Sequence, residues 1–309
     1  MKFTVTYPLS VHPSNPEFLD TANVLRFARA ADAAGFDALG FTDHPAPSQK
    51  WLDGGGHDAL DPFAALGFCA AVTERIRLMP HVLVLPYRNP FATAKAIATV
   101  DLLSGGRFVL GTAAGYLRSE YAALGVDFEE RNALFDEAIE VLQAVWSSDD
   151  FRYEGSHFTA RGVTANPKPV QKPHPPIWIG GNSRVARKRV ARYGQGWMPF
   201  FAPPLMARST RTPALESPED LARFLDELWE FFEEEKRDPT GIDIHFHTEA
   251  GGTPGQADFD SEATLRGVEA LEAIGVTHCG VGLPADSMSR CLDGLAQFGE
   301  TVIAAQSTG

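Results

Sequence analysis

Strand signals and amphipathic-helix signals alternate along almost the whole of this chain. Short apolar runs such as Phe36–Thr42, Ile76–Leu85 and Ile177–Gly180 are predicted strands, and each is followed by a stretch with helical periodicity. After Ile76–Leu85, Asn89-Pro90 predicts a helix from about Phe91 to Leu103, which Gly105 ends. This alternation predicts βαβ units with a parallel sheet. The pattern gives eight strand–helix pairs, so we expect a TIM-type (β/α)8 barrel. A doubly wound open sheet is the alternative, because alternation alone does not show that the sheet closes.

One segment interrupts the alternation, from residue 151 to residue 176. It holds aromatic residues, glycines and five prolines, which favour a hairpin and an extended arm over a barrel unit. We expect this insertion to lie over the barrel and to contribute to subunit contacts. A length of 309 residues is typical of one barrel with an insertion, so residues 1–309 are expected to form a single domain.

Charge and composition limit the partners of the chain. The formal net charge of −13 argues against nucleic acid and anionic membranes, because both require a basic face. The apolar run at the N-terminus is too short for a signal peptide, and no run is long enough to cross a bilayer. The three cysteines have no metal-type spacing. We therefore expect a cytoplasmic protein whose partner is a small-molecule substrate.

In a parallel barrel, the loops that follow the strands form the functional face. Asp43 and His44 come directly after a predicted strand and before a proline. A histidine there can exchange a proton near neutral pH, and the adjacent carboxylate can orient it. The alternative is that His44 only hydrogen-bonds a neighbouring loop. The strand at residues 107–111 opens into a turn of small residues, which lets a flat or phosphorylated ligand approach the backbone.

A second small-residue turn, Gly180–Ser183, precedes a helix at residues 183–193. The free amides of a helix N-terminus after glycines form an anion site. The helix carries five basic residues and no acid, which suits a phosphate with a further anionic tail. The alternative is a solvated basic face that pairs with acidic helices elsewhere.

Two histidines, His245 and His247, are two residues apart on a predicted strand and therefore point to the same face. This spacing makes a metal-dependent barrel hydrolase the rival class of enzyme. No carboxylate cluster or second histidine pair at the earlier strand ends completes such a site, so we expect no metal. Sequence motifs of dinucleotide sites, P-loops and nucleophile elbows are absent from the chain.

Several ordered motifs resemble the bacterial luciferase-like superfamily of flavin- and deazaflavin-dependent oxidoreductases. The resemblance is closest to the branch that uses coenzyme F420, a deazaflavin with a phosphate and a polyglutamate tail. It covers the chain from the first strand to Gly196-Trp197. The motifs are Asp43-His44, the segment from Ile76 to Pro90, Ala98–Arg107 and Pro175–Ser183.

The resemblance implies a cofactor site, residue by residue. A non-proline cis peptide at His81–Val82 would support the tricyclic ring, near Asp43 and His44. The family's ring and ribityl contacts match Gly111, Thr112, Gly115 and Tyr116. The phosphate region matches Gly180, Gly181, Asn182 and Ser183, and Arg184 and Lys188 are candidates for the acidic tail.

The implied reaction is hydride transfer between F420 and a small organic substrate in the barrel mouth. His44, oriented by Asp43, is the expected acid or base, and Trp51, Trp197 and Phe200 are expected to border the substrate. Family members that oxidise sugar phosphates carry a glutamate where this chain has Ala113. Glu120 lies further along and is a candidate substitute acid.

Two other functions stay open. One is an FMN-dependent monooxygenase, in which reduced flavin activates oxygen, and the other is a non-catalytic cofactor-binding protein. The basic helix favours the longer and more acidic cofactor, F420. The resemblance also implies a homodimer formed through the early helices.

Overall fold

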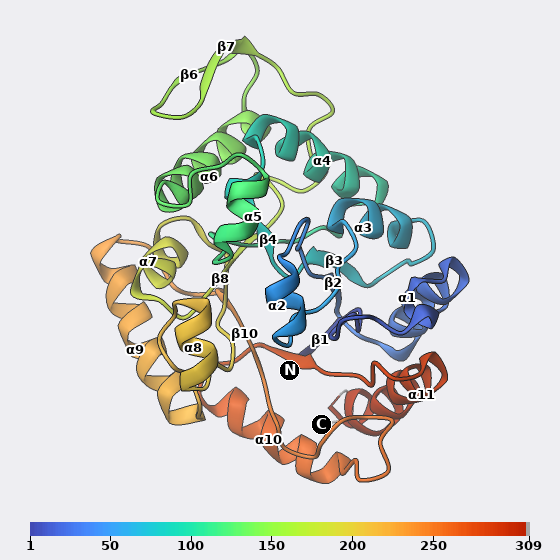
Figure 1. Cartoon of the computed structure of the whole chain (residues 1–309). Helices are drawn as coiled ribbons and strands as arrows, with labels where there is room; N and C mark the ends of the chain where they lie inside the picture. The colour runs from blue at the N-terminus through green and yellow to red at the C-terminus, as the bar shows by residue number, and fades with distance from the viewer. Residues whose placement is uncertain (307–309) are drawn as a thin grey trace.

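The computed structural model describes residues 1–306, and within that range nine parallel strands form the wall of a barrel (Figure 1). The first and last strands of the chain pair with each other in the middle of this order. In their order around the barrel, the strands are β3 (Arg77–Pro80), β2 (Ala38–Phe41), β1 (Lys2–Thr6), β11 (His278–Val281), β10 (Asp243–His247), β9 (Gly196–Met198), β8 (Ile177–Gly180), β5 (Leu110–Ala113) and β4 (Leu83–Val84).

The barrel closes through its third strand, which is broken into two parts. β3 pairs with β2, whereas its continuation β4 pairs with β5. A single parallel bridge between Leu78 and Phe108 joins the two sides below the break. The predicted (β/α)8 barrel is confirmed, and the doubly wound alternative is excluded. The predicted continuous strand at residues 76–85 was wrong, because the chain leaves the sheet at His81 and Val82.

The helices pack around the strands as an outer ring (Figure 1). Most begin where the sequence places a capping residue: Asp61 before Pro62, Asn89 before Pro90 and Ser183 each accept a backbone N–H of the first turn. The helices are α1 (Thr21–Ala34), α2 (Gln49–Asp53), α3 (Pro62–Ala70), α4 (Pro90–Leu103), α5 (Arg118–Ala123), α6 (Arg131–Ser147), α7 (Arg184–Tyr193), α8 (Pro204–Thr210), α9 (Pro218–Glu234), α10 (Ser261–Ala273), α11 (Met288–Phe298) and α12 (Ala304–Gln306).

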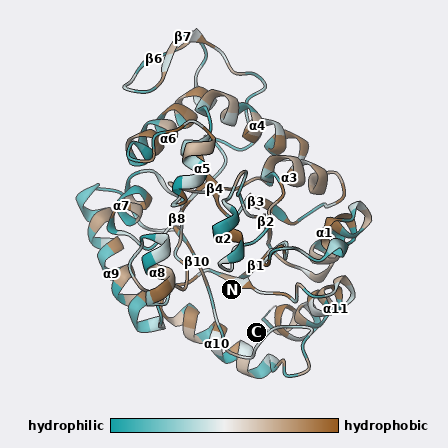
Figure 2. Cartoon of the chain, in the orientation of Figure 1, coloured by the Kyte–Doolittle hydropathy of each residue, from teal (hydrophilic) through white to brown (hydrophobic). Residues whose placement is uncertain are grey.

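The apolar core has three parts, the smallest of which holds Tyr121 and Phe128. The largest part fills the space between the sheet and the helices, and it includes fully buried Phe27, Phe135 and Trp197. A small cluster with Met79, Trp178 and Met198 forms a separate core. Figure 2 shows α3 and α4 as mainly hydrophobic and α7 and α9 as more hydrophilic. α7 and α9 are joined by ion pairs, among them Arg184–Glu227 and Lys188–Glu234.

The insertion forms a hairpin of β6 (Phe151–Glu154) and β7 (Thr159–Val163), as predicted, followed by an extended arm. The hairpin lies on the outer side of α4 and α6 (Figure 1), so the expectation that it covers the barrel was wrong. The cause is the buried carboxylate of Glu137 on α6. This carboxylate accepts hydrogen bonds from the backbone of His157 and Phe158 at the hairpin turn.

The attachment of this hairpin is expected to weaken as the pH rises. Hydrogen bonding of the His157 ring to Glu137, at 2.7 Å, raises the pKa of His157 above its ordinary value near 6.5. The charged ring therefore stabilises the folded hairpin below about pH 6.5, and this contribution is lost as the pH passes the raised pKa. Hydrogen exchange of the hairpin amides between pH 6 and 9 measures the loss. In His157→Gln the extra pH dependence should vanish.

No helix of residues 1–306 combines the length and the apolar character needed to cross a membrane.

Candidate functional site

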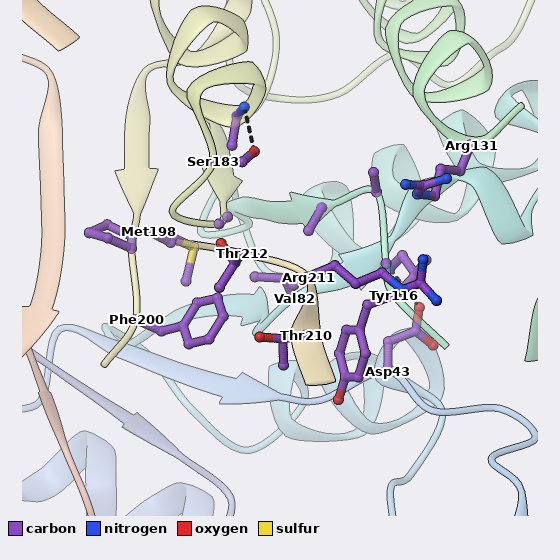
Figure 3. Close-up of a pocket in the computed structure, with 18 of the residues that line it drawn as sticks. Asp43, Val82, Tyr116, Arg131, Ser183, Met198, Phe200, Thr210, Arg211 and Thr212 are labelled. Carbon is purple, nitrogen blue, oxygen red and sulfur yellow. Dashed lines mark hydrogen bonds between the residues drawn. The ribbon is translucent and has the colours of Figure 1, made fainter. Parts of the chain in front are cut away.

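A cavity of about 500 Å³ opens at the carboxyl ends of the strands, where barrel enzymes place their active sites. Its walls come from the ends of β2, β4, β5, β8 and β9 and from the segment that follows α8 (Figure 3). The wall is more apolar than polar, with Val82, Met198 and Phe200 among the lining side chains. A cavity of this size and character accommodates a cofactor-sized ligand.

The break in the third strand lies on the cavity wall. The His81–Val82 peptide is cis, which confirms the bond that the resemblance implied. His81 Nδ1 lies 2.8 Å from Thr6 Oγ1, and burial lowers the pKa of His81 to about 4. The ring is therefore neutral near pH 7. The side chain of Val82 faces Gly180, where an added Cβ would lie 3.3 Å from Val82 Cγ1.

His44 also lines the cavity, and its partner is Glu120. His44 Nδ1 lies 3.2 Å from Glu120 Oε2. A carboxylate only accepts hydrogen bonds, so Nδ1 carries the proton and Nε2 is the basic nitrogen of the neutral ring. Glu120 is fully buried and also accepts from Tyr87 Oη at 2.9 Å and from the Ala46 amide at 3.2 Å. Burial, followed by the charge of Glu120, raises the pKa of Tyr87.

Asp43 does not orient His44, so that expectation was wrong. Its carboxylate accepts two hydrogen bonds from the Arg88 guanidinium, at 2.6 and 2.8 Å, and one from the Val84 amide at 2.9 Å. Asp43 is buried and ties the end of β2 to β4. Although Asp43 borders the cavity, its oxygens are engaged in this buried ion pair, whereas the carboxylate that contacts His44 comes from α5, 76 residues away.

Aromatic rings surround His44 at the mouth. The centroid of its ring is 4.5 Å from that of Trp51, 5.0 Å from that of His57 and 6.4 Å from that of Tyr116. Burial lowers the pKa of His57 and raises the pKa of Tyr116. Trp51 thus contacts His44 but is not among the residues that line the cavity, so its place beside a substrate stays a prediction. His57 was missed, and its only signal in the sequence is its place directly after the Gly54–Gly56 run.

The small-residue turn after β5 divides into two parts. Gly111 and Thr112 belong to the barrel wall: a Cβ on Gly111 would lie 2.3 Å from the Pro80 carbonyl oxygen, and Thr112 Oγ1 donates to Leu83. Neither residue lines the cavity, because each is engaged with the third strand. Gly115 and Tyr116 do line it. The missing side chain of Gly111 therefore allows β5 to approach β3 closely.

The turn between β8 and α7 presents backbone amides to the cavity. Gly180, Gly181 and Ser183 line it. Within residues 1–306, the amides of Ser183, Arg184 and Val185 have no hydrogen-bond acceptor. Asn182 is buried, and its side chain bonds to the backbone of Phe200 and Pro213. Asn182 therefore holds the turn in place and does not itself reach the cavity.

The basic residues proposed for an acidic tail lie outside the cavity. Arg184 Nη1 is 2.6 Å from Glu227, and Lys188 Nζ is 3.4 Å from Glu234, both on α9. Positions 184 and 188 share one helix face, whereas 185 and 189 face the cavity and α6. The alternative interpretation of this helix, a basic face paired with acidic helices, is the one that the structure bears out.

Two arginines that the sequence analysis missed line the cavity instead. Arg131 begins α6, and Arg211 follows α8 with a positive φ of 56°. Both side chains lie against the ring of Phe128, although Arg211 comes 80 residues after Arg131 in the chain. No local motif marks either residue, because the pairing depends on the fold.

The two aromatic residues of β9 and its loop have different places. Phe200 lines the cavity, as expected. Trp197 lies in the outer core with none of its surface exposed, and its Nε1 donates to the Gly181 carbonyl at 2.9 Å. Successive residues of a strand point to opposite faces, so Met198 points to the cavity and Trp197 away from it. Trp197 therefore does not border a substrate.

His245 and His247 do not form part of a metal cluster in the described part of the chain. His245 Nε2 bonds to Thr4 Oγ1 at 2.7 Å, and His247 Nε2 lies 2.9 Å from Glu249. No group of three or more metal-ligating side chains is found in residues 1–306. The hydrolase alternative has no site in this range.

Residues 1–250 match the family model of the luciferase-like monooxygenases. Among curated proteins, the chain is 34% identical over 180 residues to the F420-dependent glucose-6-phosphate dehydrogenase of Beutenbergia cavernae, covering 57% of this chain and 52% of that one. It is 34% identical over 125 residues to the FMNH2-dependent dimethylsulfone monooxygenase of Pseudomonas putida, covering 40% of this chain and 34% of that one. The matches thus span about a third to a half of these relatives.

Solved structures match over nearly the whole chain at lower identity. The monooxygenase RslO1 of Streptomyces bottropensis superimposes with a TM-score of 0.81 at 21% identity, covering 99% of this chain and all of that one. The F420-dependent tetrahydromethanopterin reductase of Methanopyrus kandleri gives 0.73 at 18%, covering 98% and 99%. At these identities the likeness establishes the shared fold.

Proposed function

Because the chain belongs to the luciferase-like monooxygenase family, we propose that it transfers a hydride between coenzyme F420 and a small organic substrate in the barrel mouth. The family contains oxidoreductases and monooxygenases, with both F420-dependent and FMNH2-dependent relatives of this chain. The cofactor and the substrate are the parts that we propose.

The residues of the cavity fit a planar ring with an anionic end. The broken third strand, with Val82 beside the bare backbone of Gly180, offers an apolar shelf. The free amides of Ser183, Arg184 and Val185 suit a phosphate, because unpaired N–H groups at a helix N-terminus attract anions. His81, neutral because of burial, can hydrogen-bond the ring without adding charge.

When bound, F420 supplies hydride chemistry, and the protein supplies position and a proton. His44 is the proposed acid or base, with Nε2 as the nitrogen that exchanges the proton. Buried Glu120 holds the ring in place through its hydrogen bond with Nδ1. Trp51 and Tyr116 beside His44 limit the access of water.

One observation carries this proposal: His44, held from behind by buried Glu120, lines the same cavity as Ser183 and Val185 at the start of α7, whose amides are free. The choice of F420 over FMN is supported by Arg131 and Arg211 on the cavity wall, because F420 carries more negative charge. Reduced FMN with oxygen is the second candidate, which the relative from Pseudomonas putida favours.

Titration of the purified protein with F420 and with FMN, followed by fluorescence, tests the proposal. We expect saturable binding of F420 and at least about tenfold weaker binding of FMN, about 1.4 kcal/mol. Binding of FMN alone would move the protein to the monooxygenase branch. If neither cofactor binds, the proposed function is wrong.

A further inference from the structure

Three arginines surround one phenylalanine beside the cavity. The guanidinium carbons of Arg118, Arg131 and Arg211 lie 4.1, 3.9 and 5.2 Å from the centroid of Phe128. Phe128 is buried between α5 and α6, and the three arginines come from the starts of these helices and from the end of α8. The ring face attracts each cation. Arg118 Nη2 donates to Glu129 at 2.6 Å and Arg131 Nη1 donates to the Phe128 carbonyl at 2.8 Å, so the other N–H donors of these two groups and those of Arg211 are left for a further acceptor.

The three arginines carry more positive charge than the acidic residues near them compensate. Within residues 1–306, the only carboxylate in ion-pairing distance of the three arginines is Glu129, 2.6 Å from Arg118 and 3.9 Å from Arg131. Arg211 has no carboxylate and no side-chain hydrogen bond in the same range. In a chain with a net charge of −13, this uncompensated positive charge is unusual. An anion bound there would relieve the repulsion between the guanidinium groups.

Arg131 and Arg211 both line the main cavity. In Figure 3 the Arg211 side chain extends toward the side of the cavity on which Arg131 lies. A third lining arginine, Arg189, is already engaged with Asp136 at 2.6 Å and with Asn132. Among these lining arginines, the donors that remain for a ligand are therefore those of Arg211 and the ones of Arg131 other than Nη1, which donates to the Phe128 carbonyl.

We propose that Arg131 and Arg211 form a second anion site of the cavity, separate from the amides of α7, which binds a carboxylate or phosphate group. The proposal deepens the proposed function and rests on it for the source of the anion. That source is either the tail of the cofactor or an anionic substrate. In both cases the bound molecules place anionic groups at two points of one cavity.

The test compares Arg131→Gln/Arg211→Gln with a control of equal charge, Lys188→Gln/Arg192→Gln, which changes two exposed residues of α7 that pair with Glu234 and Glu140 outside the cavity. The ligands are F420 with its tail, the deazaflavin 5′-phosphate, which ends at the phosphate, and FMN. If the anion is the tail, the Arg131/Arg211 variant loses at least about tenfold in affinity for F420, the loss expected for a hydrogen bond to a charged group. Its affinity for the two shorter ligands, and all affinities of the control, stay unchanged.

If the anion belongs to the substrate, the Arg131/Arg211 variant binds all three cofactors as the wild type does. In that case its KM rises at least about tenfold for carboxylate- or phosphate-bearing substrates, with KM for neutral analogues unchanged. Equal losses for F420, the 5′-phosphate and FMN would place the arginines at the α7 phosphate and overturn a second site. Equal losses of affinity in the control variant would also overturn a second site.

A measurement without cofactor separates this inference from the proposed function. Citrate should raise the melting temperature of the apoprotein and of the control more than that of the Arg131/Arg211 variant, at matched ionic strength. If the wild type binds no flavin or deazaflavin but shows this difference, the proposed function fails and the anion site stands. If citrate acts equally on all three proteins, and cofactor and substrate binding is unaltered, the site is refuted. If the double variant does not fold, the same measurements are made on the single variant Arg211→Gln, because Arg211 is exposed.

Discussion

Replacing His44 with alanine is expected to lower cofactor-dependent turnover by about 10²–10⁴-fold, the usual contribution of a positioned acid or base. Cofactor affinity should stay unchanged, because His44 lies on the side of Glu120 and Trp51 and not at the α7 turn. The measurement is steady-state turnover of F420 or reduced F420 with a substrate found by screening alcohols, ketones and enones, together with the dissociation constant of the cofactor.

The companion variant Glu120→Gln tests the origin of this effect. The amide keeps the size of the side chain but removes the negative charge that holds the His44 ring. Turnover should therefore fall while cofactor affinity stays unchanged, because the ring is no longer fixed by a charged acceptor. If His44→Ala turns over as fast as the wild type, the histidine is not the acid or base. Wild-type binding without turnover on any substrate would instead favour a carrier.

Replacing Asp43 with asparagine is expected to destabilise the fold by about 3 kcal/mol, at the lower end of the range for breaking a buried ion pair. Asp43 has 1% of its side chain exposed and Arg88 has 20%, so the guanidinium loses a buried partner but keeps some contact with water. The Val84 amide loses a charged acceptor as well. Urea unfolding of the cofactor-free protein measures the change.

The matched control is the double variant Asp43→Asn/Arg88→Gln. Removing both charges leaves no unpaired buried ion, so the double variant should be more stable than the sum of the two single variants predicts. The sequence analysis assigned Asp43 to catalysis. That assignment would return if Asp43→Asn is as stable as the wild type and loses turnover as His44→Ala does.

The regular parts of the fold were predictable from local signals. The strand Ile177–Gly180 was predicted to the residue, because a proline precedes it and a glycine follows it. Helix α4 was predicted to within one residue from Asn89-Pro90 and Gly105. The short helices α2, α5 and α8 were missed, since five to seven residues are too few to show helical periodicity. The break at His81–Val82 came from the resemblance and not from the apolar run itself.

The side-chain partners were harder to predict, because they depend on direction in space. Asp43 and His44 are neighbours in the chain, yet their side chains contact Arg88 and Glu120 respectively. Trp197 and Met198 diverge for the same reason on β9. Proximity in sequence is therefore a poor guide to side-chain partners at strand ends, where adjacent side chains point to different sides of the sheet.

For helix α7, the prediction from composition was right about the excess of positive charge and wrong about where that charge lies. Its excess of positive charge is real, but Arg184 and Lys188 are paired with α9. The positive charge that the cavity wall offers a ligand comes from Arg211 and from Arg131, which is only 3.9 Å from Glu129, and no local pattern brings the two arginines together. The dimer expected through the early helices stays a prediction.

A crystal structure of the protein with bound F420 tests the central claim most directly. The account predicts the deazaflavin ring against His81 and Val82, and its phosphate in hydrogen-bond distance of the amides of Ser183, Arg184 and Val185. A ring bound outside this cavity, or a phosphate held away from the start of α7, would contradict it.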